Sequence, residues 1–339
     1  MRRRLLVGSA VLMAGIVASS LPAPAIDQAM IDAAKREGSV TVYTTLVIDQ
    51  LARPMAAAFE SKYGVKVNPI RADAGEIVRR VVDEAKAGHP QGDVFDGLTN
   101  VAALKQQNLV QPWAPDTAEN LPKNFVDPGG YWSALYVLVT VPAINTNLVA
   151  PKDEPKSWDD LLGPAWKGKM VWGVNTSTTG AAGFVALMLR EYGEEKGRAF
   201  LTRLAQQNVA GLQVSTAQVL DEVISGEYPL EVMGALHQAL FSASKGAPVK
   251  WLPFSPAAES LTTVSIVRNA PHPNAAKLYV DFLLSDEGQS IFRDNYYIPA
   301  SLHVPAKDPR ALPDGKLIRG QFFTPEEINA QISNWQKIV

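Results

Sequence analysis

A cluster of hydroxyl side chains lies between one predicted strand and the helix that follows it. Residues 175–180 read Asn-Thr-Ser-Thr-Thr-Gly and come directly after the apolar run Lys169–Val174. Hydroxyls and free backbone N–H groups at a helix start bind anions, and the helix dipole favours negative charge there. The same hydroxyls can equally serve only as helix caps. We expect an anion-binding segment here, with ligand contacts from Asn175, Ser177, Thr178, Thr179 and Gly180.

Four more polar residues follow predicted strands nearer the N-terminus. Thr44 ends the run SVTVYT and Thr45 directly follows it. Arg71 follows a second predicted strand, and Thr99 follows a third. Open α/β sheets bind ligands beyond the carboxyl ends of their strands. An arginine placed there can hold a carboxylate or phosphate through two parallel hydrogen bonds. These four residues are therefore candidate ligand contacts, the alternative being ordinary turn polarity or solvated surface side chains.

Sequence patterns typical of catalysis are absent. The chain has no G-x-S-x-G, no H-E-x-x-H and no G-x-x-x-x-G-K-[ST]. It also has no cysteine, which excludes disulfides, thiolate metal sites and cysteine nucleophiles. No spacing of carboxylates implies a catalytic pair. We predict a binding protein without cofactor or metal, and keep an enzyme on the same fold as an alternative because a fold does not fix a function.

Strand and helix patterns alternate in the first part of the chain. The β-branched run Ser39–Thr44 predicts a strand, and apolar residues every four positions from Leu51 predict a helix that ends before Gly64. Further strands are predicted at 65–68 and 93–98, and further helices at 77–85 and 101–108. This β-α-β-α-β order predicts a parallel, doubly wound sheet.

A second set of the same elements follows the nearly all-apolar run Tyr131–Val141, which predicts a buried strand. Strands are predicted at 169–174 and 229–233, with helices from Gly180, over 198–208, and from the capping box Ser215–Gln218 to Gly226. A strand at 261–267, helices at 275–284 and 287–294, and an amphipathic helix from Pro325 to the end complete the chain. Two sets joined by a hydrophobic crossing strand predict two α/β lobes with a cleft between them.

Length and composition agree with this organisation. The chain has 339 residues, of which 47% are hydrophobic and 19% charged, and this length suits about two domains. The formal net charge of −2 gives no basic excess for nucleic acid. Arg2–Arg4, the apolar run Leu5–Leu21 and the small-x-small sequence Ala23–Ala25 predict a secretory signal peptide cleaved after Ala25. An uncleaved membrane anchor is the alternative.

Six segments in this order resemble the ferric-ion and small-anion branch of the periplasmic solute-binding proteins of ATP-driven (ABC) importers. They are GSVTVYTT, AAFESKYGVKV, GDVFDGLTNVAALKQQNLVQPW, SWDDLLGPAWKGKMVWGVNTSTTGAAG, LDEVISGEYPLEV and NAPHPNAAKLYVDFLLSDEGQSIF. The resemblance implies the two-lobed α/β fold of type 2 periplasmic binding proteins, in which two doubly wound sheets are joined by crossing hinge strands and close over a ligand.

The resemblance also implies a division of the chain and a set of partners. Residues 1–25 would be the signal peptide, 27–138 plus 254–339 one lobe, and 139–253 the other. The protein would be a periplasmic monomer that binds a small-molecule ligand and delivers it to the membrane permease subunits of an ABC transporter. A ligand-binding module of a sensor, which would need a separate membrane partner, is a further alternative.

Two more site residues are candidates: His237, which follows the predicted strand 229–233 at a helix start, and Glu259, which the resemblance implies. A lone histidine is more often a core residue than a ligand contact, and Glu259 can equally be structural. Ferric-binding relatives carry adjacent tyrosines just past the second-lobe strand, where this chain reads Met233–His237 without tyrosine. The pair Tyr296-Tyr297 lies elsewhere, and we expect it to fill the core. We therefore do not expect a ferric site built on a tyrosine pair. A pocket lined by hydroxyls, amides and an arginine suits a phosphorylated or carboxylated organic anion, with ferric ion bound at a site without the tyrosine pair as the alternative.

Overall fold

The computed structural model describes residues 28–97, 100–174, 179–311 and 317–318. Its helices are α1 (Gln28–Glu37), α2 (Arg53–Tyr63), α3 (Ala74–Lys86), α4 (Asn100–Gln106), α5 (Thr179–Tyr192), α6 (Glu194–Ala205), α7 (Thr216–Ser225), α8 (Leu236–Ser244), α9 (Pro273–Leu284) and α10 (Asp286–Asp294). Its strands are β1 (Ser39–Thr44), β2 (Lys66–Arg71), β3 (Val94–Gly97), β4 (Val110–Gln111), β5 (Ser133–Asn145), β6 (Met170–Gly173), β7 (Ala210–Leu212), β8 (Leu230–Ala235), β9 (Val249–Trp251), β10 (Ala257–Val267), β11 (Ile298–Pro299) and β12 (Leu317–Ile318).

Local sequence explains several of these boundaries. Helix α2 ends at Gly64, which adopts a left-handed conformation with φ of 69° that other residues rarely take. Helix α7 begins at the predicted capping box, in which Ser215 and Gln218 satisfy each other's backbone N–H groups. It ends at Gly226, again left-handed with φ of 93°. Before the short helical turn Asp159–Leu162, the Asp160 N–H donates to the Ser157 hydroxyl at 3.3 Å, and the Ser157 N–H donates to the Asp160 carboxylate at 3.1 Å.

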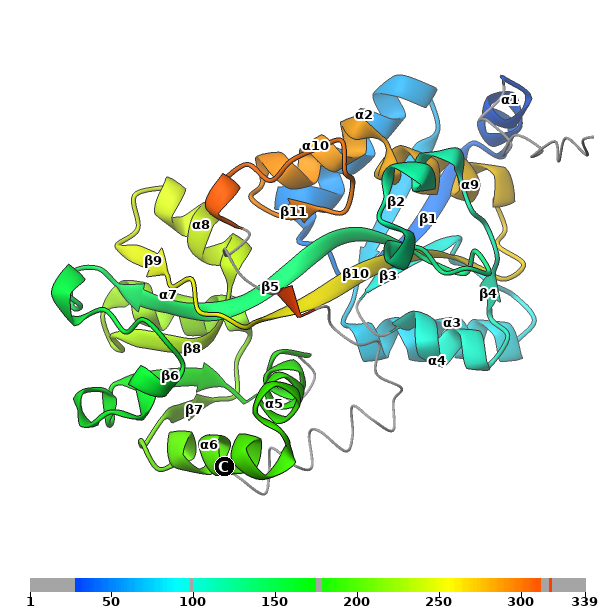
Figure 1. Ribbon diagram of the computed structural model, residues 1–339. Helices are drawn as coiled ribbons and strands as arrows, with labels where there is room; N and C mark the ends of the chain where they lie inside the picture. Colours follow the sequence, from blue (N-terminus) through cyan, green and yellow to red (C-terminus); the bar gives the residue numbers. More distant parts are fainter. Residues whose placement is uncertain (1–27, 98–99, 175–178, 312–316, 319–339) are drawn as a thin grey trace, which may run out of the picture.

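The strands form one hydrogen-bonded path in the order β2-β1-β3-β10-β5-β8-β6-β7 (Figure 1). Strand β1 runs parallel to β2 and β3, and β6 runs parallel to β7 and β8. The two long strands β5 and β10 pair with each other in antiparallel fashion and pass from one parallel set to the other. The two predicted doubly wound sheets are therefore joined edge to edge by a crossing pair of strands.

Separate hydrophobic cores support the two halves. In the first half, one core packs α2, α9 and α10 against one side of the sheet around Phe59 and Phe282, and a second lies on α3 and α4 around Ile77 and Leu104. The second half has its main core around Trp158, with smaller apolar clusters under α7 and α8. The predicted lobe boundaries at 138/139 and 253/254 stay a prediction.

The register of the crossing strands shows how the two parallel sets are oriented. Gly97 ends β3 beside Thr263, near the middle of β10, so the carboxyl end of β3 points toward the second half. Ala235 ends β8 beside Thr140, near the middle of β5, so the carboxyl end of β8 points back toward the first half. The carboxyl edges of both halves thus face each other across residues 136–140 and 258–262.

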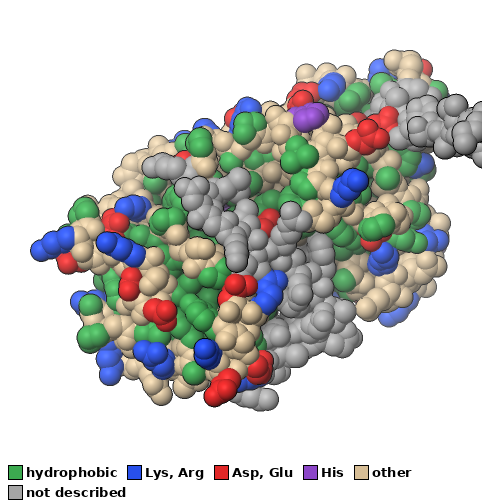
Figure 2. All heavy atoms as spheres, viewed as in Figure 1, with side chains coloured by type: hydrophobic (Ala, Val, Ile, Leu, Met, Phe, Trp, Pro, Cys, Tyr) green, Lys and Arg blue, Asp and Glu red, His purple; other side chains and the backbone are tan. Residues whose placement is uncertain are grey.

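On the face seen in Figure 2, Lys and Arg side chains are interspersed with Asp and Glu side chains, and neither sign of charge forms a large patch. This agrees with the formal net charge of −2 of the sequence. Among the described residues, no helix combines the length and the apolar character needed to span a bilayer.

Candidate functional site

The first wall of the candidate site is the carboxyl edge of β1, β2 and β3. Strand β1 ends at Thr44, which is 1% exposed, and Thr45 follows it half-buried. Both hydroxyls donate to the carboxylate of Asp96 near the end of β3: Thr44 to Oδ2, and Thr45 to Oδ1 at 2.6 Å. The Thr45 backbone N–H also donates to Oδ1, at 2.8 Å, and the Leu46 N–H donates to the Thr44 hydroxyl at 3.0 Å. The structure thus brings the two predicted threonines together around one buried acid.

Asp96 itself was not among the residues predicted from sequence. It is 2% exposed, and burial raises the pKa of its carboxyl while the hydrogen bonds from Thr44 and Thr45 oppose that rise. A signal was present, because Asp96 interrupts the short apolar run Val94–Gly97. A charged residue inside a buried strand needs partners, and the hydroxyls that end the neighbouring strand supply them.

Arg71 ends β2 in register with Thr44, so the two backbones are adjacent at the same edge. The side chain of Arg71 is exposed and has no carboxylate within ion-pair distance among the described residues. Helix α3 begins three residues later, and no side chain caps its first turn. An unpaired guanidinium beside free helix N–H groups gives this edge the donors that an anionic group requires.

The middle of the crossing strands lies between the two walls. Side chains alternate between the faces of a strand, and on one face of this pair Leu138, Thr140 and Ser260 are partly exposed. Glu259 lies on the other face, where it is 4% exposed opposite Val139. We expected Glu259 to precede the returning strand, but it lies inside β10, because the strand begins at Ala257 rather than at Leu261.

His237 lies in the first turn of α8, directly after β8 ends. It is 9% exposed, and its ring stacks on Tyr297 with centroids 4.1 Å apart. Burial lowers the pKa of the imidazole to about 3, so it is neutral at physiological pH. His237 therefore has the surroundings of a packed core residue next to the carboxyl edge of the second half.

The tyrosine pair expected to fill the core does so. Tyr297 is 5% exposed and contacts Tyr136 edge-on at 4.8 Å, and Tyr296 packs partly buried against the same core. Burial raises the pKa of the Tyr297 hydroxyl above its usual value. Since iron binding by tyrosine requires the phenolate, this environment disfavours Tyr297 as a ferric ligand. Among the described residues, no group of three or more His, Asp or Glu side chains is arranged to hold a metal ion.

The second wall of the predicted site is only partly within the described residues. Asn175, Ser177 and Thr178, together with Thr99 of the first wall, lie outside them. Thr179 and Gly180 form the start of α5. The strand predicted before the hydroxyl-rich segment and the helix predicted after it are therefore confirmed, as β6 and α5. The contacts expected of these residues stay a prediction.

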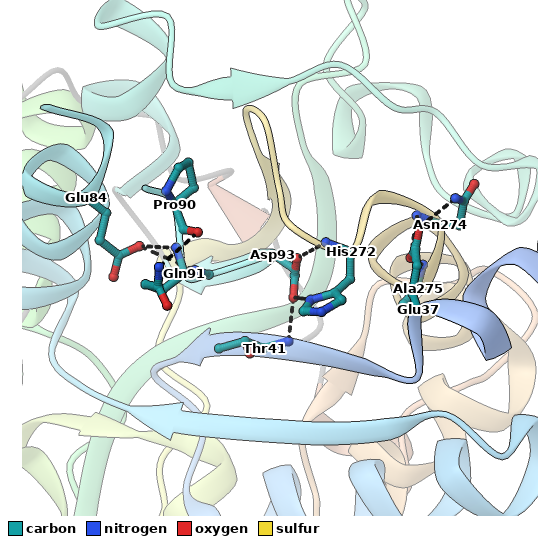
Figure 3. A network of polar contacts seen from close by, with 10 residues as sticks. Glu37, Thr41, Glu84, Pro90, Gln91, Asp93, His272, Asn274 and Ala275 are labelled. Carbon is teal, nitrogen blue, oxygen red and sulfur yellow. Dashed lines mark hydrogen bonds and ion pairs between the residues drawn. The ribbon is translucent and has the colours of Figure 1, made fainter. Parts of the chain in front are cut away.

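A different polar network lies at the opposite edge of the first half (Figure 3). Asp93, fully buried before β3, accepts from the Thr41 N–H at 2.7 Å and from the His272 N–H at 2.7 Å, and its carboxylate lies 3.0 Å from His272 Nδ1. Glu37 accepts from the backbone N–H groups of Asn274 and Ala275 at the start of α9. Both acids hold backbone together at the amino-terminal ends of the strands, away from the facing carboxyl edges.

Comparison with known proteins agrees with this architecture. Residues 94–322 match the family model described as bacterial extracellular solute-binding protein, and the chain belongs to that family. A probable ABC transporter periplasmic-binding protein of Sinorhizobium fredii, y4fP, is 27% identical over 81% of this chain and 79% of its own length. A putative 2-aminoethylphosphonate-binding periplasmic protein of Salmonella typhimurium is 27% identical over 83% of this chain and 85% of its own. Iron uptake protein A1 of Synechocystis is 25% identical over 74% and 72%.

A solved structure confirms the fold class. The periplasmic binding protein P5PA superposes with a TM-score of 0.74 at 26% identity, covering 89% of this chain and 99% of P5PA. The fold is therefore that of the type 2 periplasmic binding proteins, with two α/β lobes joined by crossing strands. The protein is a substrate-binding component of an ABC transporter, the class that both the fold and the family define.

Proposed function

We propose that this protein captures a small, oxygen-rich organic anion, phosphorylated or carboxylated, in a cleft between its lobes and delivers it to the membrane permease. The observation that carries the proposal is Arg71, an exposed guanidinium without a carboxylate partner among the described residues, at the edge that faces the other lobe. Buried or paired arginines serve structure, whereas an unpaired arginine at a ligand-binding edge is available to an anion.

The contacts are proposed to come from both lobes. Thr45 and Arg71, with Thr99, would form the first wall, and Asn175, Ser177, Thr178, Thr179 and Gly180 would bind the anionic group at the start of α5. Thr44 and Glu259 would support these contacts from buried positions, and His237 would border the site at the start of α8. The relative from Salmonella typhimurium is named for 2-aminoethylphosphonate, a small organic anion, which supports the proposed ligand class. The relative from Synechocystis is named for iron uptake, so the choice against ferric ion depends on the buried environment of Tyr297.

The remaining steps of the transport cycle are part of the same proposal. Residues 1–25 would direct export and be removed, the mature protein would act as a monomer in the periplasm, and it would bind its ligand without transforming it. Intact mass of protein isolated from the exporting host should correspond to a chain that begins at Ile26. A retained Met1 in exported protein would contradict the signal-peptide proposal.

The test of the ligand class combines identification with substitution. Native mass spectrometry of freshly purified protein should show a co-purified organic anion. Calorimetry with that anion should show a 10- to 100-fold weaker affinity for Arg71→Ala, since a hydrogen bond to a charged group contributes roughly 1.5–3 kcal/mol. Arg203→Ala, which removes an exposed arginine on the outer helix α6, is the matched control and should bind as wild type does. Equal affinities for Arg71→Ala and Arg203→Ala would contradict the proposed site.

A further inference from the structure

The hydroxyl of Thr45 has a fixed hydrogen-bonding role. Its proton is directed to Asp96 Oδ1 at 2.6 Å, and the backbone N–H of the same residue donates to the same oxygen at 2.8 Å. The hydrogen bonds that both carboxyl oxygens accept favour the ionised form of Asp96. An ionised carboxylate has no proton to donate, so the hydroxyl is the donor in this pair.

Thr44 is fixed in the same sense. The Leu46 N–H donates to its hydroxyl oxygen at 3.0 Å, and the hydroxyl proton is directed to Asp96 Oδ2. Thr44 is also 1% exposed and presents little to a ligand. Thr45 is half-buried and is therefore the member of this pair that a ligand can reach.

A hydroxyl that has already donated its proton can offer a ligand only its lone pairs. Turning the Thr45 hydroxyl outward to donate would break a hydrogen bond to a carboxylate, which is stronger than a bond between neutral groups. The first wall thus combines an acceptor, Thr45 Oγ1, with a cation one strand away, Arg71, whose backbone neighbour is Thr44.

We propose that the Thr44–Thr45–Asp96 network makes the first wall selective for anions that also carry a hydrogen-bond donor, an ammonium or hydroxyl group, over anions with an apolar remainder. The inference rests on the proposed function and specifies the ligand class at the same site. A bare inorganic anion or an alkyl anion would leave the Thr45 acceptor unpaired in the closed protein, and an unpaired buried polar group lowers affinity.

Two matched sets of probes test this selectivity by calorimetry on the purified mature protein. The short set is 2-aminoethylphosphonate, 2-hydroxyethylphosphonate and ethylphosphonate, which differ only in the terminal group. The long set is glucose 6-phosphate and hexyl phosphate. In whichever set binds, a donor-bearing probe should bind at least about tenfold tighter than the alkyl probe. Preference for the aminated over the hydroxylated short probe would identify ammonium as the donor, and the reverse order would identify hydroxyl.

Substitutions separate a role in selectivity from a role in stability. Thr45→Val should reduce the affinity ratio between donor-bearing and alkyl probes toward one, with the larger loss of affinity for the donor-bearing probe. Asp96→Asn should reduce the same ratio, because an amide that donates to Thr45 lets the hydroxyl turn toward the ligand. Thr41→Val, the same change nearer the amino-terminal end of β1, is the control and should keep the wild-type ratio.

Three results would overturn the inference. An alkyl probe that binds as tightly as its donor-bearing partner would refute the selectivity and leave the anion-binding function intact. A Thr45→Val protein that weakens every probe equally would show that Thr45 has a structural role only. Failure of both sets to bind wild type, with a co-purified ligand that is not an anion, would refute the proposed function and this inference with it.

Discussion

Glu231 shows what a buried ionisable side chain means for stability in this chain. It lies in β8 at 1% exposure, with one carboxyl oxygen, Oε2, that has no hydrogen-bond partner among the described residues. Gly234 makes room for it, because a Cβ there would lie 2.8 Å from that oxygen. Burial raises the pKa of the carboxyl to about 8, so the group is largely protonated at neutral pH.

The first prediction follows from this pKa. Unfolding returns Glu231 to an ordinary pKa near 4.5, so the native state loses stability relative to the unfolded chain as pH rises from about 4.5 to about 8. Glu231→Gln has no titrating carboxyl at this position. As pH rises through this range, its free energy of unfolding should increase relative to that of wild type by at most roughly 1.4 kcal/mol per pH unit. Urea unfolding at pH 5 and pH 8 measures the difference. Glu227→Gln, at an exposed position, is the control; it keeps Glu231 and should gain no stability on wild type between pH 5 and pH 8.

The second prediction concerns iron. Tyr297 lies in the core between Tyr136 and His237, and its raised pKa opposes the phenolate that binds Fe³⁺. Addition of stoichiometric ferric citrate should therefore not produce the visible charge-transfer band of iron–phenolate binding. The contrary outcome is a purple-red protein whose colour disappears in the Tyr296→Phe/Tyr297→Phe double variant.

At the scale of elements, α9 illustrates how distant segments secure one another. Its first backbone N–H groups would be unsatisfied, and no side chain of its own caps them. Glu37, the last residue of α1, accepts from Asn274 N–H at 3.0 Å, Asn274 Nδ2 at 2.6 Å and Ala275 N–H at 2.7 Å (Figure 3). A carboxylate at a helix start also interacts favourably with the helix dipole.

The third prediction is that Glu37→Ala lowers the free energy of unfolding by about 1–3 kcal/mol, in line with loss of a helix cap and of charged hydrogen bonds. Urea denaturation followed by circular dichroism gives the value. Asp32→Ala on the same helix is the control, since Asp32 is exposed and its side-chain hydrogen bond within the described part of the chain comes from Gln28, a neighbour on its own helix. Equal effects of the two substitutions would show that Glu37 is not the cap of α9.

Sequence predicts the longer elements of this fold because their patterns are strong. The crossing strand β5 follows from a nearly continuous apolar run, and α7 follows from its capping box and Gly226. The short strands β7, β9 and β11 were not predicted. Strand β7 reads Ala-Gly-Leu and β11 reads Ile-Pro, so both are very short and contain alanine, glycine or proline, which are depleted in strands.

The candidate site was predicted in part, and the limit has a physical cause. Strand ends identify Thr44, Thr45 and Arg71, because parallel strands end at one edge. Which way a hydroxyl donates depends on a partner far away in sequence, and Asp96 lies 51 residues beyond Thr45. Linear spacing cannot show that contact, so the acceptor role of Thr45 required the structure.

At the scale of the whole molecule, the two lobes meet at more than the crossing strands. Leu236 and Leu240 of α8, the helix that directly follows β8 of the second half, belong to the main core of the first half. His237 and Phe241 on the same helix contact Tyr297 and Tyr296, with ring centroids 4.1 and 6.5 Å apart. Figure 1 shows α8 near α10 and β11, next to the strands β5 and β10 that pass between the two halves. This packing keeps the lobes together on one side while their carboxyl edges face each other on the other.

Such an arrangement favours hinge closure, in which β5 and β10 bend and the facing edges approach. A ligand can drive closure only by its greater affinity for the closed form, so it must contact both walls there. Removing contacts from either wall should therefore weaken binding and closure together. The fourth prediction is that the tightest-binding probe lowers the radius of gyration of wild type in small-angle scattering, with half-maximal change near the calorimetric dissociation constant.

Variants of each wall complete that prediction. Arg71→Ala should move the scattering transition to 10- to 100-fold higher ligand concentration, and Thr178→Ala should move it by about fivefold, since a neutral hydroxyl bond contributes about 1 kcal/mol. Saturating ligand should still compact both variants to the wild-type radius, because the crossing strands and the α8 contacts are unchanged. A hinge mechanism is refuted if ligand binds without compaction. The proposed walls are refuted if Arg71→Ala and a Ser177/Thr178/Thr179 triple-alanine variant both bind and compact as wild type does.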